Sequence, residues 1–357
     1  MAHVATITID YTKVPGDLTD YVGLIVPDGS AGYSALYALC LEGGGDIRLF
    51  KSDDTTELAR EIVTFSVSAE TGEIHYRYAG TLSSSVDTDI HVYADGSSSD
   101  YAVTATYGRN AVWVDYAAVW HLLETSGNDR IDSTGNGNDL TDTTTVASVA
   151  AEIGNGADFE ESAGEFISVT DANQTGLVGQ ANITFDTWVK YETIDSIEAY
   201  LISKDTRGTS ERSWAFGNRG NFFFFFVYTS GTTTFNQTTA HGMSAGTFYK
   251  LNYVWNGTTG DIDFYKDGAL VGNETTQTGT VDGSTSPVRI SGGAGFGGER
   301  EIDAIVDESR MYTGTRNANW IETEYNNQNS PSTFYSVAAV AGGSAAQAAR
   351  RGVIMMM

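Results

Sequence analysis

Cysteine, proline and long apolar runs are all scarce in this sequence of 357 residues. The single cysteine, Cys40, excludes an internal disulfide framework and any zinc site built from several cysteines. Four prolines against 40 glycines favour a turn-rich fold over a proline-rich linker. No stretch of about 18 or more apolar residues is present, so we predict no membrane insertion.

Positive charge is also scarce, because 20 basic residues face 46 acidic ones and the formal net charge is −26. A charge of this sign repels the phosphates of nucleic acids and of anionic lipids, so we exclude nucleic acid as a partner. The first 14 residues alternate in polarity and lack a basic segment followed by an apolar run. We therefore expect no export by the usual secretory signal.

Polar and apolar residues alternate with a period of two in many segments, for example at residues 5–9, 183–189 and 249–255. This pattern, rich in β-branched and aromatic residues, is typical of half-buried antiparallel strands. The pair Asp267 and Gly268 supplies the positive φ angles of a tight hairpin turn. The predicted fold class is all-β.

The spacing of strands and turn clusters predicts two β-sandwich (jelly-roll) domains in tandem with a short C-terminal tail. The first domain is expected over residues 1–112 and the second over residues 113–335. Residues 336–357, rich in Ala and Gly, match neither sandwich pattern and are expected to form the tail. Helical turns are expected only at residues 54–59 and 317–326.

A series of short motifs lies in the second predicted domain, at residues 119–122, 132–138, 154–159, 183–189, 202–204, 247–249, 265–268 and 305–312. In this order they resemble the laminin-G-like, concanavalin A-like jelly-roll family of bacterial and phage surface proteins. The resemblance covers roughly residues 117–330. Residues 6–10, 14–20, 46–50 and 93–96 resemble a β-sandwich domain of unknown function that commonly precedes this jelly roll. The resemblance implies an architecture rather than an activity.

The loop over residues 132–139 is the strongest metal candidate, because carboxylate, amide and backbone oxygens on a Gly-rich turn suit Ca²⁺. In the resembled family a structural Ca²⁺ often joins such a loop to an acid near the last strand. The ligands here would be Asp132, Asn136 and Asp307. The alternative is an Asx-turn in which the same side chains cap their own backbone without a metal.

The segment over residues 301–308 resembles the catalytic strand of jelly-roll glucanases, which places acids on one strand face. The second glutamate should stand at Ile305, or at Val306 if a bulge intervenes, and this departure removes the acid/base of hydrolysis. No other catalytic motif is present, so we predict no enzyme activity. His75 and His91 alternate with apolar neighbours and are interpreted as packed or surface groups rather than ligands.

The aromatic run at residues 222–228 is apolar on both strand faces, so at least one face must be covered. One interpretation is a central strand of the core. The other places one face in a concave groove where sugar rings stack on aromatic side chains and polar groups bind the hydroxyls. The glycan-binding candidates are then Tyr200, Trp214, Asn218, Arg219 and Asn221.

The end of the tail combines two basic residues with an apolar terminus in an acid-free stretch. An exposed apolar end favours docking, so we expect it to bind other virion subunits or copies of itself. The alternative is a frayed terminus. The assembly candidates are Arg350, Arg351, Ile354, Met355, Met356 and Met357.

These observations favour a non-enzymatic structural virion protein of a tailed phage. It would be a capsid decoration, tail or fibre component on the virion surface, with a lectin-like head that binds a host surface glycan. Such a protein is made in the host cytoplasm and needs no secretion signal. The alternative is a cell-surface adhesion or carbohydrate-binding module located outside the cell, and a glycan hydrolase is disfavoured by Ile305.

Overall fold

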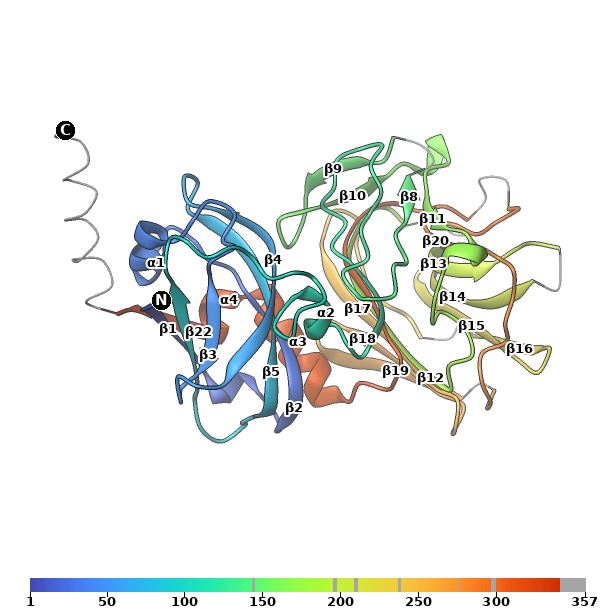
Figure 1. Ribbon diagram of the computed structural model, residues 1–357. Helices are drawn as coiled ribbons and strands as arrows, with labels where there is room; N and C mark the ends of the chain where they lie inside the picture. Colours follow the sequence, from blue (N-terminus) through green and yellow to red (C-terminus); the bar gives the residue numbers. More distant parts are fainter. Residues whose placement is uncertain are drawn as a thin grey trace. The chain divides into compact units, whose positions relative to one another are not determined.

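The computed structural model describes residues 1–142, 145–194, 198–208, 211–236, 239–275, 277–296 and 300–340. The chain divides into two units (Figure 1): Met1–Val114 together with Glu322–Met357, and Asp115–Ile321. Most regular elements are antiparallel strands, which confirms the predicted all-β class. No helix among the described residues has both the length and the apolar character needed to cross a membrane.

The first unit is a path of seven strands in the order β2-β5-β4-β3-β6-β1-β22. Strand β4 pairs with β3 at its start and with β5 over the rest of its length, so it is shared by two sheets. The strands are β1 (Ala2–Ile9), β2 (Leu18–Ile25), β3 (Arg48–Lys51), β4 (Glu57–Ser66), β5 (Thr71–Leu82), β6 (Thr88–Ala94) and β22 (Tyr335–Ala339).

Short helices connect these strands: η1 (Tyr11–Lys13), η2 (Ala31–Tyr33), α1 (Ser34–Leu39), α2 (Arg109–Val112) and α4 (Pro331–Phe334). Helix α3 (Ala318–Asn329) confirms the helix expected near residues 317–326. The helical turn expected at residues 54–59 is wrong, because Glu57 already begins strand β4. Asp53 accepts hydrogen bonds from the amides of Thr55 and Thr56, which forms a turn before that strand.

The second domain is predicted to end at residue 335, whereas the second unit ends at Ile321 and the chain returns to the first unit from Glu322 onward. Strand β22 pairs with β1, with Ile7 opposite Val337, so the first residues of the predicted tail belong to a sheet. Asn327 of α3 accepts from the amide of Leu24 (2.7 Å) and donates to its carbonyl (2.8 Å). This side chain satisfies the free edge of β2, which would otherwise be open to another chain.

The second unit is a sandwich of two antiparallel sheets, in the orders β19-β18-β17-β12-β21-β10-β9 and β16-β15-β14-β13-β20-β11-β8, with β7 also paired to β21. The first sheet contains β7 (Tyr116–Trp120), β9 (Ala147–Ala150), β10 (Asn155–Phe159), β12 (Asn182–Thr193), β17 (Tyr249–Asn256), β18 (Asp261–Lys266), β19 (Ala269–Thr275) and β21 (Asp303–Tyr312). The second contains β8 (Thr141–Asp142), β11 (Ile167–Val169), β13 (Glu198–Asp205), β14 (Arg212–Arg219), β15 (Phe222–Thr229), β16 (Thr232–Asn236) and β20 (Val288–Ile290). Two single-turn helices, η3 (Glu161–Ala163) and η4 (Asp171–Asn173), lie in the connections.

One apolar core joins the two sheets of this unit and includes Trp120, Trp214, Trp255, Phe185 and Phe225, all 0–1% exposed. Side chains alternate into this core because successive residues of a strand point to opposite faces. The predicted hairpin turn is confirmed, since Asp267 (φ 54°) and Gly268 (φ 78°) both adopt left-handed backbone between β18 and β19.

Strands β12, β17 and β21 carry buried charged groups on the sheet face opposite the core. The Lys250 ammonium on β17 lies 2.5 Å from Asp186 on β12, and both side chains are at most 5% exposed. Asp307 is fully buried; its Oδ2 accepts from the amide of Ile153 (2.8 Å), and its Oδ1 has no hydrogen-bond partner among the described residues. Burial, together with the charge of neighbouring Glu308, raises the pKa of the Asp307 carboxyl well above its usual range.

The Asp307 carboxyl makes the stability of the second unit depend on pH. Its folded-state pKa is raised, so the native state holds this proton to higher pH than the unfolded chain does. The free energy of unfolding therefore decreases as the pH rises from about 4 through the raised pKa. Asp307→Asn removes this pH-dependent loss of stability. At neutral pH the free energy of unfolding of the variant should therefore exceed that of wild type by about 1 kcal/mol or more.

Urea denaturation at pH 4 and at pH 7.5 measures this difference. Asp303→Asn is the matched control, since Asp303 lies on the same strand and is only partly buried. An Asp307→Asn variant that loses as much stability with rising pH as wild type and Asp303→Asn would contradict the buried-charge assignment.

Strand β22 should contribute to the stability of the first unit. Truncation after Phe334 removes the pairing with β1 and the Tyr335 hydroxyl that accepts from the amide of Val26 (2.8 Å). We expect the amides of β1 to exchange with solvent much faster, because their partners are lost, while those of β12 and β17 stay protected. Hydrogen exchange followed by mass spectrometry measures the protection of both groups of strands. Unchanged protection of β1 would contradict a stabilising role of β22.

Candidate functional site

The aromatic strand β15 is a core strand, buried on both faces. Phe223 and Phe225 enter the core between the sheets. Phe224 and Phe226 form a second cluster on the opposite face with Tyr200, where the Tyr200 and Phe224 rings stack at 5.5 Å between centroids. The packing interpretation of this run is therefore confirmed for the described residues.

The predicted stacking face for sugars is wrong, because Tyr200 and Trp214 lie on opposite faces of their sheet. Trp214 points into the core and donates its indole N–H to the Leu177 carbonyl (3.0 Å). Tyr200 belongs to the outer cluster, because a register shift between Tyr200 and Ile202 reverses the alternation of β13. Both side chains are at most 1% exposed, so neither ring has a face available to a sugar.

The three polar glycan candidates lie near one another along the chain but in different surroundings. Asn218 is 1% exposed on β14. Arg219 is half-exposed and forms an ion pair with Glu198 (3.4 Å). Asn221 lies in the exposed turn between β14 and β15, where its carbonyl accepts from the amide of His241 (2.9 Å). They do not form one surface with Tyr200 and Trp214.

The loop that starts at Asp132 has the hydrogen bonds of an Asx-turn. Oδ1 of Asp132 accepts from the amides of Val119 (3.1 Å) and Thr134 (2.9 Å). Oδ2 accepts from the Thr134 hydroxyl (2.8 Å) and the amide of Asn138 (2.9 Å). A carboxylate offers about four lone-pair sites, and protein donors occupy all four.

The other two calcium candidates have separate surroundings. The side-chain nitrogen Nδ2 of Asn136 donates to the carbonyls of Tyr116 (3.1 Å) and Ala117 (3.0 Å). Asp307, on β21, accepts from the backbone amide of Ile153. This donor set does not fit a Ca²⁺ site, because Asp132 has no oxygen lone pair left for an ion. The Asx-turn alternative is the one that the hydrogen bonds support.

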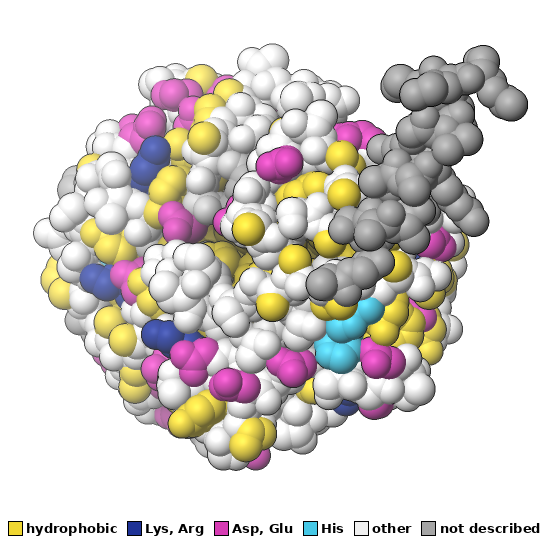
Figure 2. Space-filling view, turned by 90° about the vertical axis from the view of Figure 1, so that its left-hand side faces the viewer, with side chains coloured by type: hydrophobic (Ala, Val, Ile, Leu, Met, Phe, Trp, Pro, Cys, Tyr) yellow, Lys and Arg dark blue, Asp and Glu magenta, His cyan; other side chains and the backbone are white. Residues whose placement is uncertain are grey.

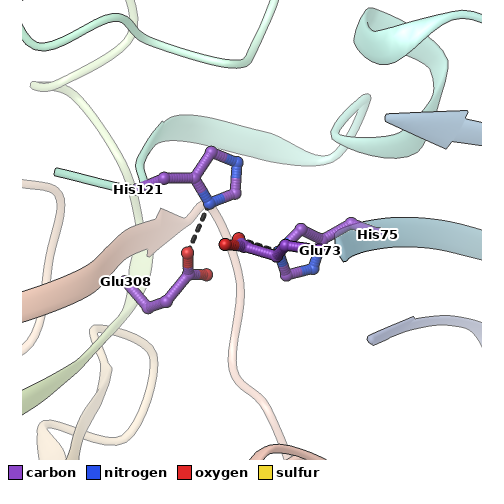
Figure 3. A group of neighbouring side chains, drawn as sticks. All are labelled: Glu73, His75, His121 and Glu308. Carbon is purple, nitrogen blue, oxygen red and sulfur yellow. Dashed lines mark hydrogen bonds and ion pairs between the residues drawn. The ribbon is translucent and has the colours of Figure 1, made fainter. Parts of the chain in front are cut away.

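A buried histidine–glutamate pair adjoins Asp307 in the second unit. His121 Nδ1 lies 2.5 Å from Glu308 Oε1 (Figure 3), and the Arg310 guanidinium also binds Glu308. Glu308 adopts a left-handed φ of 51° at a register shift between β21 and β12. This bulge turns the Glu308 carboxylate toward His121 and Arg310 and so neutralises it.

The first unit has its own buried pair of the same type. Glu73 Oε1 lies 3.1 Å from His75 Nε2, both on β5 (Figure 3). The His75 ring lies 5.2 Å from that of Trp113, whose indole N–H donates to Glu61. The interpretation of His75 as a packed group is confirmed.

The second unit has a pocket of about 350 Å³ on the outer face of the β17-β18-β19 hairpins. Asp261, Asp263 and Tyr265 alternate along β18 and point to this face, while the core face of the strand carries Ile262 and Phe264. The remaining lining comes from neighbouring strands and from the segment that leads into α3: Val254, Asn256, Asn273, Thr315, Arg316, Asn317 and Ala318.

Polar side chains in this pocket are paired across the strands. Asn273 Nδ2 donates to Asp263 Oδ1 (2.5 Å), and the Thr275 hydroxyl donates to Asp261 Oδ1 (3.2 Å). The Arg316 guanidinium lies 3.5 Å from the ring centroid of Tyr312. The pocket therefore offers carboxylate acceptors, an amide and a guanidinium, while the Tyr265 side chain in its lining is only 5% exposed.

Sequence reasoning noted the β18–β19 hairpin but did not identify this pocket. The alternation of acidic and apolar residues over 261–265 was the available signal, because it predicts a row of acids on the solvent face. The assembly candidates Arg350, Arg351, Ile354, Met355, Met356 and Met357 lie outside the described residues.

Three solved structures illustrate the similarities of the chain. The binding domain of Paraclostridial Mosquitocidal Protein 1 has 14% identity and a TM-score of 0.48; the match covers 60% of this chain and 52% of that one, about half its length. Domain 4 of AbnA, a GH43 extracellular arabinanase from Geobacillus stearothermophilus in complex with arabinotriose, has 18% identity and a TM-score of 0.44, covering 58% and 97%. The binding domain of Botulinum Neurotoxin DC in complex with SialylT has 10% identity and a TM-score of 0.43, covering 60% and 52%.

Among curated protein sequences, none matches the chain. A family model does match, and it is described as the concanavalin A-like lectin/glucanases superfamily. The match extends over residues 162–322, within the roughly 117–330 expected from the sequence motifs. Residues 162–322 are thus similar to the concanavalin A-like lectin/glucanases superfamily, and the two packed antiparallel sheets of the second unit agree with that similarity.

Proposed function

We propose that the second unit is a non-enzymatic carbohydrate-binding domain that takes a glycan in the pocket formed by β17, β18 and β19. The observation that carries this proposal is the row of Asp261 and Asp263 beside Tyr265 on the outer face of a lectin-type jelly roll. Carboxylates accept hydrogen bonds from sugar hydroxyls.

The pocket is organised before a ligand arrives. The Asp263–Asn273 and Asp261–Thr275 contacts hold the acids on paired strands, so little side-chain freedom remains to be lost on binding. Arg316 is held against Tyr312 and, at 3.5 Å, against the ring of Trp320. A guanidinium fixed in this way can donate to a hydroxyl or to an acidic sugar.

The absence of enzyme activity belongs to the same proposal. In the strand that resembles the glucanase catalytic strand, Ile305 is 5% exposed and lies opposite Asp158 and Lys190 on the neighbouring strands. Asp307 is fully buried and Glu308 is bound to His121 and Arg310. A retaining pair needs two carboxyls about 5–5.5 Å apart on either side of a substrate, whereas Asp307 and Glu308 are at most 1% exposed.

We further propose that this binding unit belongs to a structural protein of a tailed-phage virion, as a capsid decoration, tail or fibre component. The order of the predicted β-sandwich and the jelly roll in one chain supports this role, as does the strongly acidic composition without a cysteine framework. The residues after β22 would dock onto other virion subunits or onto copies of the chain. A cell-surface adhesion or carbohydrate-binding module is the alternative role for the same fold.

Glycan binding should depend on the acidic row of the pocket. We expect the full chain to bind a glycan on an array, and Asp263→Ala or Asn273→Ala to weaken that binding by about tenfold or more, because each removes a polar partner of the bound sugar. Glu274→Ala is the matched control, since Glu274 neighbours Asn273 on β19 but does not line the pocket. Isothermal titration with the best glycan of the array measures the affinities.

A chain that binds no glycan, or variants that bind as tightly as Glu274→Ala, would contradict the proposed pocket. Circular dichroism of each variant should match wild type, because the substituted side chains lie outside the core.

Assembly should depend on the residues after β22. Truncation after Val340 keeps the pairing of β22 with β1, so the first unit should remain folded, while self-association measured by light scattering should be lost. The expected loss follows from removal of the two arginines and the apolar methionine end. A truncated chain with the same molar mass in solution as the full chain would exclude these residues as the docking element.

A further inference from the structure

Strand β1 has a bulge that changes the direction of His3. In a regular strand, His3 would share the buried face of Ala5, Ile7 and Ile9. The pairing with β6 shifts between His3 and Ala5, so Val4 becomes buried beside Ala5. His3 moves to the outer face of the sheet, which is the kind of re-aiming that β-bulges produce.

On that outer face His3 lies in a cluster with Asp54 and His91. Each of the three residues offers one ligand atom, and these atoms all lie within 4.8 Å of one another. The imidazole rings of His3 and His91 stack with centroids 4.2 Å apart, and His91 Nδ1 lies 2.5 Å from Asp54 Oδ1. Figure 2 shows histidine side chains gathered at one place on the surface of this unit, beside acidic side chains.

Neighbouring groups hold each member of the cluster in place. His3 Nε2 donates to the carbonyl of Ala5 (3.0 Å), which leaves a lone pair on Nδ1. The Tyr93 hydroxyl donates to Asp54 Oδ1 (2.8 Å), and the amide of Asp54 donates to the Lys51 carbonyl (3.0 Å) in the turn between β3 and β4. Such outer contacts orient ligands at metal sites.

The cluster is accessible from solvent. The side chain of His91 is 15% exposed and that of Asp54 is 51% exposed, so an ion can reach the cluster from solvent.

We propose that His3, Asp54 and His91 form a binding site for a divalent transition-metal ion of the Zn²⁺ type on the first unit. Two imidazoles and one carboxylate are the donor set of zinc sites with three protein ligands, in which the fourth position is open to water or to another molecule. Tetrahedral zinc bonds of about 2.0–2.1 Å need ligand atoms about 3.3 Å apart. The ligand atoms lie within 4.8 Å of one another, so binding of an ion would require the side chains to move to these separations.

The chemistry of the donors selects the ion. Imidazole nitrogen suits Zn²⁺, Cu²⁺ and Ni²⁺, whereas Ca²⁺ and Mg²⁺ require more oxygen ligands than the single carboxylate of Asp54. The acidic surface of the chain will attract any divalent cation weakly. Specific binding should therefore be visible as one Zn²⁺ per chain that excess Mg²⁺ does not displace.

The test uses the full chain freed of metal and titrated with ZnCl₂ in the presence of millimolar Mg²⁺ by isothermal calorimetry. We expect one strong site per chain and a higher melting temperature with Zn²⁺, because the ion binds the folded state. Replacement of His3 or His91 by Gln, or of Asp54 by Asn, should weaken Zn²⁺ binding by about tenfold or more.

Asp53→Asn is the matched control for Asp54→Asn. It removes the same charge one residue away, and its side chain faces Thr55 and Thr56 rather than the histidines. Unchanged binding in Asp53→Asn with weakened binding in Asp54→Asn supports the site. Equal affinity in wild type and in His91→Gln, or a wild-type chain that binds no Zn²⁺ above the Mg²⁺ background, overturns it.

Discussion

The second unit depends on strand β21, because three other strands pair with it. Strand β12 lies along one edge, while β10 and then β7 share the other edge. Such sharing needs a break in regular register, and the bulge at Glu308 supplies it with a left-handed backbone. The same bulge places Asp307 and Glu308 in succession inside the protein, where each carboxyl must be protonated or paired.

The buried charges of this unit are best understood as a consequence of that arrangement. Lys250 and Asp186 neutralise each other on adjacent strands, and His121 and Arg310 do so for Glu308. Removing one member of a buried pair leaves an uncompensated charge and typically costs about 3–5 kcal/mol. Asp307 and Glu308 are therefore part of the buried packing of this unit.

In both units the proposed binding groups lie on outer sheet faces. In the second unit both faces of β15 are covered, so the aromatic side chains stabilise the core and the polar pocket forms on the β17-β18-β19 hairpins. In the first unit the core takes Ala5, Ile7 and Ile9, and the opposite face of the same strands carries the histidine cluster. The inner faces determine the fold, and the outer faces remain free to bind.

The all-β class, the β18–β19 hairpin and the packed nature of the aromatic run were all predictable from the sequence. Each of them depends on local periodicity or on turn residues such as Asp267 and Gly268, which act over a few positions. The jelly roll was likewise predictable from motifs in family order. The Asx-turn at Asp132 was one of two alternatives, since its residues suit either a calcium ion or their own backbone.

Other features were decided only by tertiary structure, because they depend on strand register and on which distant strands pair. A single bulge moves Tyr200 away from the face of Trp214, and another moves His3 toward His91. Period-two alternation carries no information about where such a bulge occurs, and one inserted residue reverses every side chain beyond it. The return of residues 335–339 to pair with β1 spans nearly the whole chain. Local sequence determined the strands of this protein, and long-range pairing decided which of their side chains meet.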